Sequence, residues 1–93
     1  MEIQIDVTQD DIDSGRRRGS RSCPIARAAR RALPTGVIVK VGTFSVEIRS
    51  VSGIAEWENP KAVRGFIAAF DTFGPAAVEP FSFSVELGEW NET

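Results

Sequence analysis

Residues 37–49 read VIVKVGTFSVEIR and carry the clearest structural pattern of the sequence. Two runs rich in β-branched residues, 37–41 and 44–49, are separated only by Gly42-Thr43. Apolar and polar residues alternate in the second run, which is typical of a strand with one buried face. A two-residue loop that begins with glycine favours a type II′ turn. We therefore expect a β-hairpin in which Phe44, Val46 and Ile48 face the core.

A helix is expected on each side of this hairpin. The first occupies residues 24–33, after an N-cap at Ser22 or Cys23, and ends there because a proline follows. The second occupies residues 60–73, between an Asn-Pro start and a Gly-Pro stop. Both segments place apolar residues three and four positions apart, so each predicts a helix with one buried face.

Two further strands are expected near the ends of the chain, over residues 2–7 and 81–87. The resulting order β-α-β-β-α-β is that of the ferredoxin-like sandwich. We therefore predict one α+β domain over residues 1–93, with two helices on one face of a mostly antiparallel sheet. At least five of the six phenylalanines should lie in its core, and the tail from about residue 88 should fray. An alternative α+β arrangement, in which residues 50–57 add a fifth strand or the sheet order differs, stays open.

Thr8 precedes a short acidic segment that contains Asp10, Asp11 and Asp13. This segment predicts a single helical turn that Thr8 caps and that closes at Gly15. Three close carboxylates also raise the question of a cation site, but their spacing matches no EF-hand loop. We expect no metal ligands here.

The chain has 93 residues, no histidine, no tyrosine and a single cysteine, Cys23. Without histidine the commonest general base and the commonest transition-metal ligand are missing. One cysteine excludes an intrachain disulfide and a thiolate zinc site. We predict a non-enzymatic protein with no catalytic residues, metal ions or cofactors. The longest unbroken apolar run is 66–70, too short for a signal peptide or a membrane span, so we expect a cytoplasmic protein without membrane insertion.

The formal net charge of −2 hides three charge blocks along the chain. Residues 1–15 contain five acidic and no basic residues, whereas residues 16–31 contain seven arginines and no acidic residue. Residues 65–93 contain five acidic and no basic residues. The arginines can therefore neutralise the acidic blocks inside the folded protein, or they can present a positive surface to a partner.

Three kinds of ligand suit the arginine block. Our first hypothesis is a protein partner; the second is a phosphate-bearing small molecule or nucleotide, because glycines, hydroxyls and arginines precede a helix start. Nucleic acid ranks third, since the pI is near 5.1 and the expected sheet turns its aromatic residues inward. The candidate binding residues in this block are Arg16, Arg17, Arg18, Ser20, Arg21, Arg27, Arg30 and Arg31.

The two tryptophans complete the set of candidate site residues. Trp57 lies between two glutamates, and Trp90 lies in the acidic tail. Tryptophan is enriched at binding hot spots, so either side chain can contact a partner or a second copy of the chain in a homodimer. The alternative is that both pack against the protein's own core.

Several motifs together resemble a group of small actinobacterial and actinobacteriophage proteins of uncharacterised function. They are Asp-Asp-Ile-x-x-Gly over residues 10–15, Cys-Pro-Ile-Ala over 23–26, Phe-Asp-x-x-Gly over 70–74 and Pro-Phe-x-Phe over 80–83. The resemblance covers most of the chain and implies no catalytic residues. It implies a phage-encoded protein that engages a host protein in the host cytoplasm, in host takeover or interference with defence.

Overall fold

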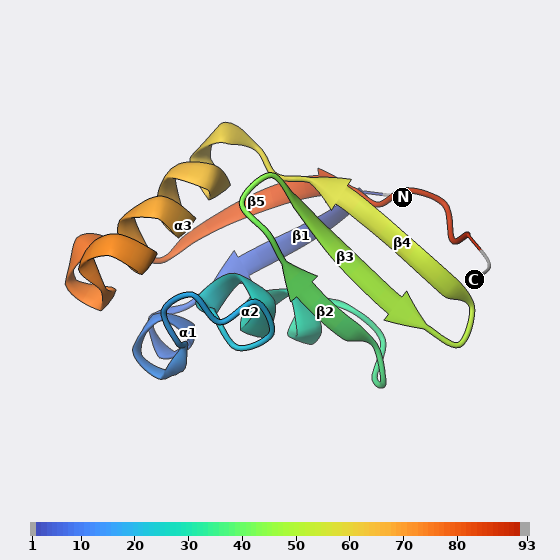
Figure 1. Ribbon diagram of the computed structural model, residues 1–93, viewed down its shortest axis with the longest axis horizontal. Helices are drawn as coiled ribbons and strands as arrows, with labels where there is room; N and C mark the ends of the chain where they lie inside the picture. The colour runs from blue at the N-terminus through green and yellow to red at the C-terminus, as the bar shows by residue number, and fades with distance from the viewer. Residues whose placement is uncertain (1, 92–93) are drawn as a thin grey trace.

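The computed structural model describes residues 2–91 and shows an α+β fold with three α-helices and two antiparallel sheets (Figure 1). The predicted fold class is confirmed. The elements in chain order are β1 (Glu2–Val7), α1 (Gln9–Ser14), α2 (Pro24–Ala32), β2 (Ile38–Val41), β3 (Ser45–Ser50), β4 (Gly53–Glu58), α3 (Lys61–Phe73), the 3-10 turn η1 (Pro75–Ala77) and β5 (Phe81–Glu86).

The strands form two sheets that the chain after β5 connects. β1 pairs with β5, and β2, β3 and β4 pair in that order, all antiparallel. Beyond β5, the amide of Gly88 donates to the carbonyl of Glu56 at 3.1 Å, and Asn91 exchanges two hydrogen bonds of 2.8 Å with Ile54. Residues 88–91, which the sequence led us to expect to fray, are thus hydrogen-bonded to β4. Residues 92 and 93 lie outside the described residues.

The strand set differs from the ferredoxin-like order because β4 is a fifth strand. It corresponds to the alternative arrangement that the sequence left open for residues 50–57. Gly53 has a φ of 121°, which a side chain disfavours, and so permits the tight turn between β3 and β4. From there Ala55 and Trp57 point inward while Glu56 and Glu58 point to solvent. Among the described strands every pair is antiparallel, so the parallel strand pair of the ferredoxin-like order is not found.

Local capping determines where the first two helices begin. The hydroxyl of Thr8 accepts from the amide of Asp11 at 3.2 Å, and the Asp11 carboxylate accepts from the amide of Thr8 at 2.9 Å. This reciprocal capping box starts α1 at the predicted place. Cys23 is the N-cap of α2 and Pro24 its first residue, as the sequence predicts.

The turn of the central hairpin lies one residue later than predicted. Val41 pairs with Val46, and the amide of Gly42 donates to the carbonyl of Ser45 at 2.8 Å. Phe44 therefore lies at the tip of the turn, where its side chain is 73% exposed, rather than in the core. This register pairs Val41 with Val46 and Val39 with Ile48, all of which are buried.

Asn59 holds this turn in place and is not the helix cap that the sequence predicts. Its side-chain amide donates to the carbonyls of Gly42 at 2.9 Å and Thr43 at 3.2 Å, and its backbone amide donates to that of Phe44 at 2.8 Å. Asn59 is buried, so these bonds replace the water that the turn carbonyls would otherwise bind. The third helix then begins at Lys61.

The core lies between the helices and the apolar faces of the sheets. α2 packs against β1 and β2, and the rings of Phe66 in α3 and Phe81 in β5 lie 5.0 Å apart. Four phenylalanines join the core or pack against it. Phe44 and Phe73 do not, contrary to the expectation that nearly all would; Phe73, 74% exposed, ends α3 where that helix projects past the sheet (Figure 1).

Candidate binding site

Residues 15–23, which we call the arginine loop, fold back on themselves between α1 and α2. The amide of Arg16 donates to the carbonyl of Ser22 at 2.9 Å, and the amide of Cys23 donates to that of Gly19 at 2.8 Å. Arg18 has a φ of 58°, in the left-handed region that side chains other than asparagine and aspartate rarely enter. The loop is thus a defined turn whose conformation its own hydrogen bonds maintain.

Two arginines of α2 neutralise the acidic segment of α1. Arg31 donates to both carboxylate oxygens of Asp11, at 2.8 and 2.6 Å, and Arg27 donates to Asp10 at 3.3 Å. Asp11 is fully buried, yet the guanidinium of Arg31 and the hydrogen bonds from Thr8 lower the pKa of its carboxyl to about 2. These two candidate binding residues therefore stabilise the fold.

Two other arginines attach the loop to neighbouring helices. The guanidinium of Arg17 donates to the carbonyls of Asp71, at 3.2 and 3.0 Å, and Thr72, at 2.6 Å, in the last turn of α3. Such carbonyls have no partner within a helix and carry the negative end of its dipole. Arg30 of α2 donates to the carbonyl of Arg21. The loop is consequently held to both helices.

Three arginines of the block have guanidinium groups without a hydrogen-bond or ion-pair partner among residues 2–91. Within residues 2–91, the guanidinium groups of Arg16, Arg18 and Arg21 make no hydrogen bond or ion pair, and all three residues are exposed. Ser20, also exposed, uses its carbonyl to accept from the amide of Val41 at 2.7 Å, which ties the loop to β2. Of the seven arginines in the block, these three therefore have guanidinium groups available to pair with a ligand.

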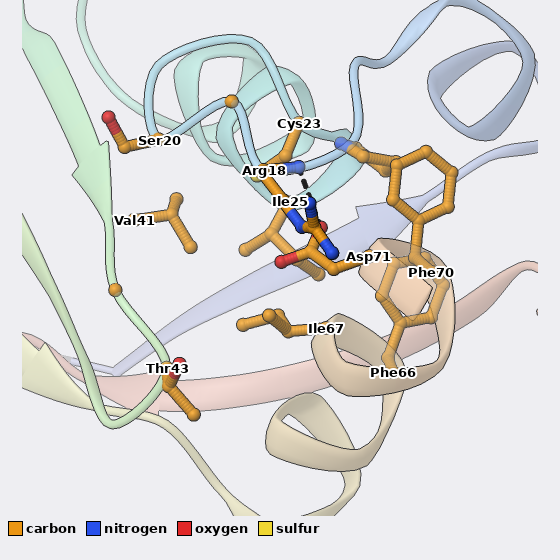
Figure 2. Close-up of a pocket in the computed structure, with 13 residues that line it drawn as sticks. Arg18, Ser20, Cys23, Ile25, Val41, Thr43, Phe66, Ile67, Phe70 and Asp71 are labelled. Carbon is orange, nitrogen blue, oxygen red and sulfur yellow. Dashed lines mark hydrogen bonds between the residues drawn. The ribbon is translucent and has the colours of Figure 1, made fainter. Parts of the chain in front are cut away.

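A cavity of about 190 Å³ lies beneath the arginine loop, between the hairpin and α3 (Figure 2). Side chains from α2, β2 and α3 form its apolar walls: Ile25, Val41, Phe66, Ile67 and Phe70. Its polar lining comes from Arg18, Ser20, Thr43 and Asp71. Three of these four are exposed, so the cavity opens to solvent.

The cavity contains both an arginine and a carboxylate. Asp71 accepts a hydrogen bond from the backbone amide of Arg18 at 2.8 Å, which fixes the carboxylate at the edge of the cavity (Figure 2). An anion entering the cavity would meet this negative charge as well as the guanidinium. The lining therefore suits an uncharged, largely apolar group better than a phosphate.

Cys23 also lines the cavity, at the start of α2. Its sulfur accepts a hydrogen bond from the amide of Ala26 at 3.5 Å, so the cysteine occupies a donor that an anion would need. Burial raises the pKa of the thiol, which keeps it protonated at neutral pH. The geometry thus supports neither a nucleophilic cysteine nor a phosphate held at this helix start.

The two tryptophans both contact the protein's own core. Trp57 is 2% exposed and belongs to the inner face of β4, so the folded protein does not present it to a partner. Its indole nitrogen has no hydrogen-bond partner within residues 2–91. Trp90 is partly buried against the core. Neither tryptophan lines the cavity that lies beneath the arginine loop.

Sequence reasoning missed the residues that approach the loop from the hairpin and α3. Asp71 offers one usable signal, because an acidic residue in the last turn of a helix faces the negative end of the dipole and needs a compensating partner. Nothing in the sequence marks Thr43 or Ile67 as cavity residues.

No family model, curated protein or solved structure matches the chain. In the part of the chain that the structure describes, no helix is both long and apolar enough to cross a membrane. Over the same residues, no group of three or more His, Cys, Asp or Glu side chains is placed to hold a metal ion.

Proposed function

We propose that this protein acts by binding rather than catalysis, and that the arginine loop contacts a protein partner rich in acidic side chains. The carrying observation is that Arg16, Arg18 and Arg21 have exposed side chains without partners in residues 2–91, on a loop that is held to its neighbours. A held loop loses little conformational entropy on binding, and arginine pairs with carboxylates through two parallel hydrogen bonds.

Apolar and basic groups next to the loop support a protein as the partner. Arg21 shares a small hollow with Lys40, with the ion pair of Arg49 and Glu47, and with Ile38, which is 48% exposed. The exposed ring of Phe44 follows Thr43 at the edge of the cavity. Arginine and aromatic residues at the centre of an interface contribute much of the binding energy.

A protein partner is favoured over a nucleic acid because the positive region is small. The outward face of the sheets exposes acidic residues, among them Asp6, Glu56 and Glu58, and the pI is near 5.1. An extended polyanion would contact these carboxylates beyond the loop, whereas a protein segment can be restricted to it. The resemblance to phage proteins would make the partner a host protein.

The test is affinity capture from nuclease-treated actinobacterial lysate. Wild type is compared with Arg16→Gln/Arg21→Gln, and with Lys61→Gln as a control that removes an exposed positive charge from α3. We expect one protein to be captured by wild type and by the control at equal yield, and at least about tenfold less by the loop variant. Equal capture by all three would overturn the proposal.

Two further readouts identify the alternative ligands. Thermal stabilisation by a nucleotide that Arg16→Gln/Arg21→Gln abolishes, with no captured protein, would replace the protein partner by a phosphate-bearing molecule. Capture of nucleic acid from untreated lysate, released by modest salt, would replace it by a polyanion.

A further inference from the structure

We infer that the cavity beneath the arginine loop receives one aromatic side chain of the partner, presented on an acidic segment. This inference rests on the proposed function and names the chemistry of the group that enters the site. It is carried by three features of the cavity: its volume, its walls and the charges at its edge.

The volume fits one aromatic ring. An apolar cavity of about 150 Å³ in a protein core can hold benzene. The present cavity measures about 190 Å³ and opens to solvent past Arg18, Ser20 and Thr43, so a ring can enter on a side chain whose backbone stays outside. A whole nucleotide is too large for this space, and a methyl-sized group would leave most of it empty.

The walls favour a ring over an aliphatic group. Phe66 and Phe70, which stack with their centroids 6.1 Å apart, both line the cavity from α3. Aromatic rings prefer offset or edge contacts with each other, which adds to the gain from burying the ring. The unpartnered guanidinium of Arg18 at the edge can also lie over the face of an entering ring.

The charges at the edge define the residues that flank the ring. Arg18 lines the entrance from the loop side, and the exposed Arg16 and Arg21 belong to the same loop, whereas Asp71 lies on the side of α3. Carboxylates on either side of the aromatic residue would reach the three guanidinium groups while the uncharged ring passes Asp71. A small anion that entered the cavity would bring its own negative charge next to Asp71. It could not pair with the guanidinium groups and avoid that carboxylate at the same time.

The first experiment uses indole as a probe of the cavity alone. Amide chemical shifts of wild type are followed by NMR while indole is added to millimolar concentration. We expect saturable shifts concentrated at Val41, Ile67 and Asp71. Thr43→Trp and Ile67→Trp, which fill the cavity from its edge and its wall, should reduce these shifts. Val51→Trp, in the exposed turn after β3, adds the same side chain elsewhere and should leave them unchanged.

The second experiment compares three pentapeptides, EDWED, EDAED and GSWSG, with blocked ends. We expect EDWED to bind at least about tenfold more tightly than either of the others. Arg16→Gln/Arg18→Gln/Arg21→Gln should weaken EDWED to the level at which wild type binds GSWSG, and Thr43→Trp should weaken it to the level at which wild type binds EDAED.

Failure of the inference and failure of the proposed function give different results. Equal binding of EDWED and EDAED, lost in the arginine variant, would overturn the aromatic occupant and leave the acidic partner. Binding of EDWED that Thr43→Trp weakens but the arginine variant does not would overturn the acidic partner and leave the aromatic occupant. The absence of saturable indole shifts at the cavity of wild type, or undiminished shifts in Thr43→Trp and Ile67→Trp proteins whose spectra show that they are folded, would also overturn the inference.

Discussion

The arginines of α2 and those of the loop come from one uninterrupted charge block, yet the fold gives them opposite roles. The half-exposed Arg31 pairs with the buried carboxylate of Asp11, whereas Arg16 and Arg21 face solvent without a partner in residues 2–91. The difference lies in what packs opposite each segment. α1 lies against α2 and presents its carboxylates to that helix, but no acidic side chain among residues 2–91 pairs with Arg16 or Arg21. Charge in a sequence therefore does not by itself mark a binding surface.

The largest expected effect tests the buried side of this comparison. Arg31→Met leaves the carboxylate of Asp11 buried with one guanidinium fewer, which should lower the free energy of unfolding by about 3 kcal/mol. Arg21→Met, the matched change on the loop, should alter it by less than about 0.5 kcal/mol. Urea denaturation of both variants measures the difference. Similar losses in the two variants would show that the arginines do not divide in this way.

A second prediction uses pH to distinguish the contribution of the Asp11–Arg31 ion pair to stability from that of the arginine loop. The pKa of the Asp11 carboxyl is lowered from 3.8 to about 2 in the folded protein, so its contribution to the free energy of unfolding is complete well above pH 3.8 and is lost as the pH falls through 2. It should amount to about 2.5 kcal/mol. Wild type should therefore lose about 2 kcal/mol more stability than Asp11→Asn between about pH 5 and pH 2, because half of the carboxyl is still ionised at pH 2. Parallel curves for the two proteins would contradict the pKa shift, and Arg16→Gln/Arg21→Gln should follow wild type.

The smallest expected effect concerns Arg17, which shares features with both the paired arginines of α2 and the unpaired arginines of the loop. It is exposed like its neighbours on the loop, but it donates to two carbonyls at the end of α3. Arg17→Met should cost about 1 kcal/mol of stability, since hydrogen bonds from a charged donor are stronger than neutral ones but water competes here. Because these contacts hold the loop over the cavity, indole shifts should also weaken. A loss of stability with unchanged indole binding would show that the cavity does not depend on this attachment.

Much of the fold follows from local rules that the sequence displays. The capping box of Thr8 and Asp11, the Cys-Pro start of α2 and the alternating pattern of β1 and β5 all involve residues close in the chain. The hairpin turn lies one residue later than the local pattern predicts because Asn59, which is distant in sequence, donates to the carbonyls of Gly42 and Thr43 in the turn. The sequence does not decide whether residues 50–57 form a fifth strand, because Gly53 fits either a turn or the start of a strand. The residues that follow it are of mixed polarity and favour neither.

The candidate site divides in the same manner. The sequence identified the loop and its arginines from composition alone, but it could not separate the pairing residues from the exposed ones, because that depends on which helix packs against α2. It also assigned Trp57 to a possible interface, whereas β4 turns this side chain inward. The cavity was not foreseen, since its walls come from three elements that are far apart along the chain.

What the sequence determined by itself was the α+β class, most element boundaries and the presence of a concentrated positive block. These depend on periodicity, capping and composition, which act over a few neighbouring residues. Only the tertiary structure decided which arginines remain available, that Asp71 meets the loop and that a cavity lies between them. Electrostatic pairing and enclosed volume depend on distances in space, and packing sets those distances through contacts between residues remote in sequence.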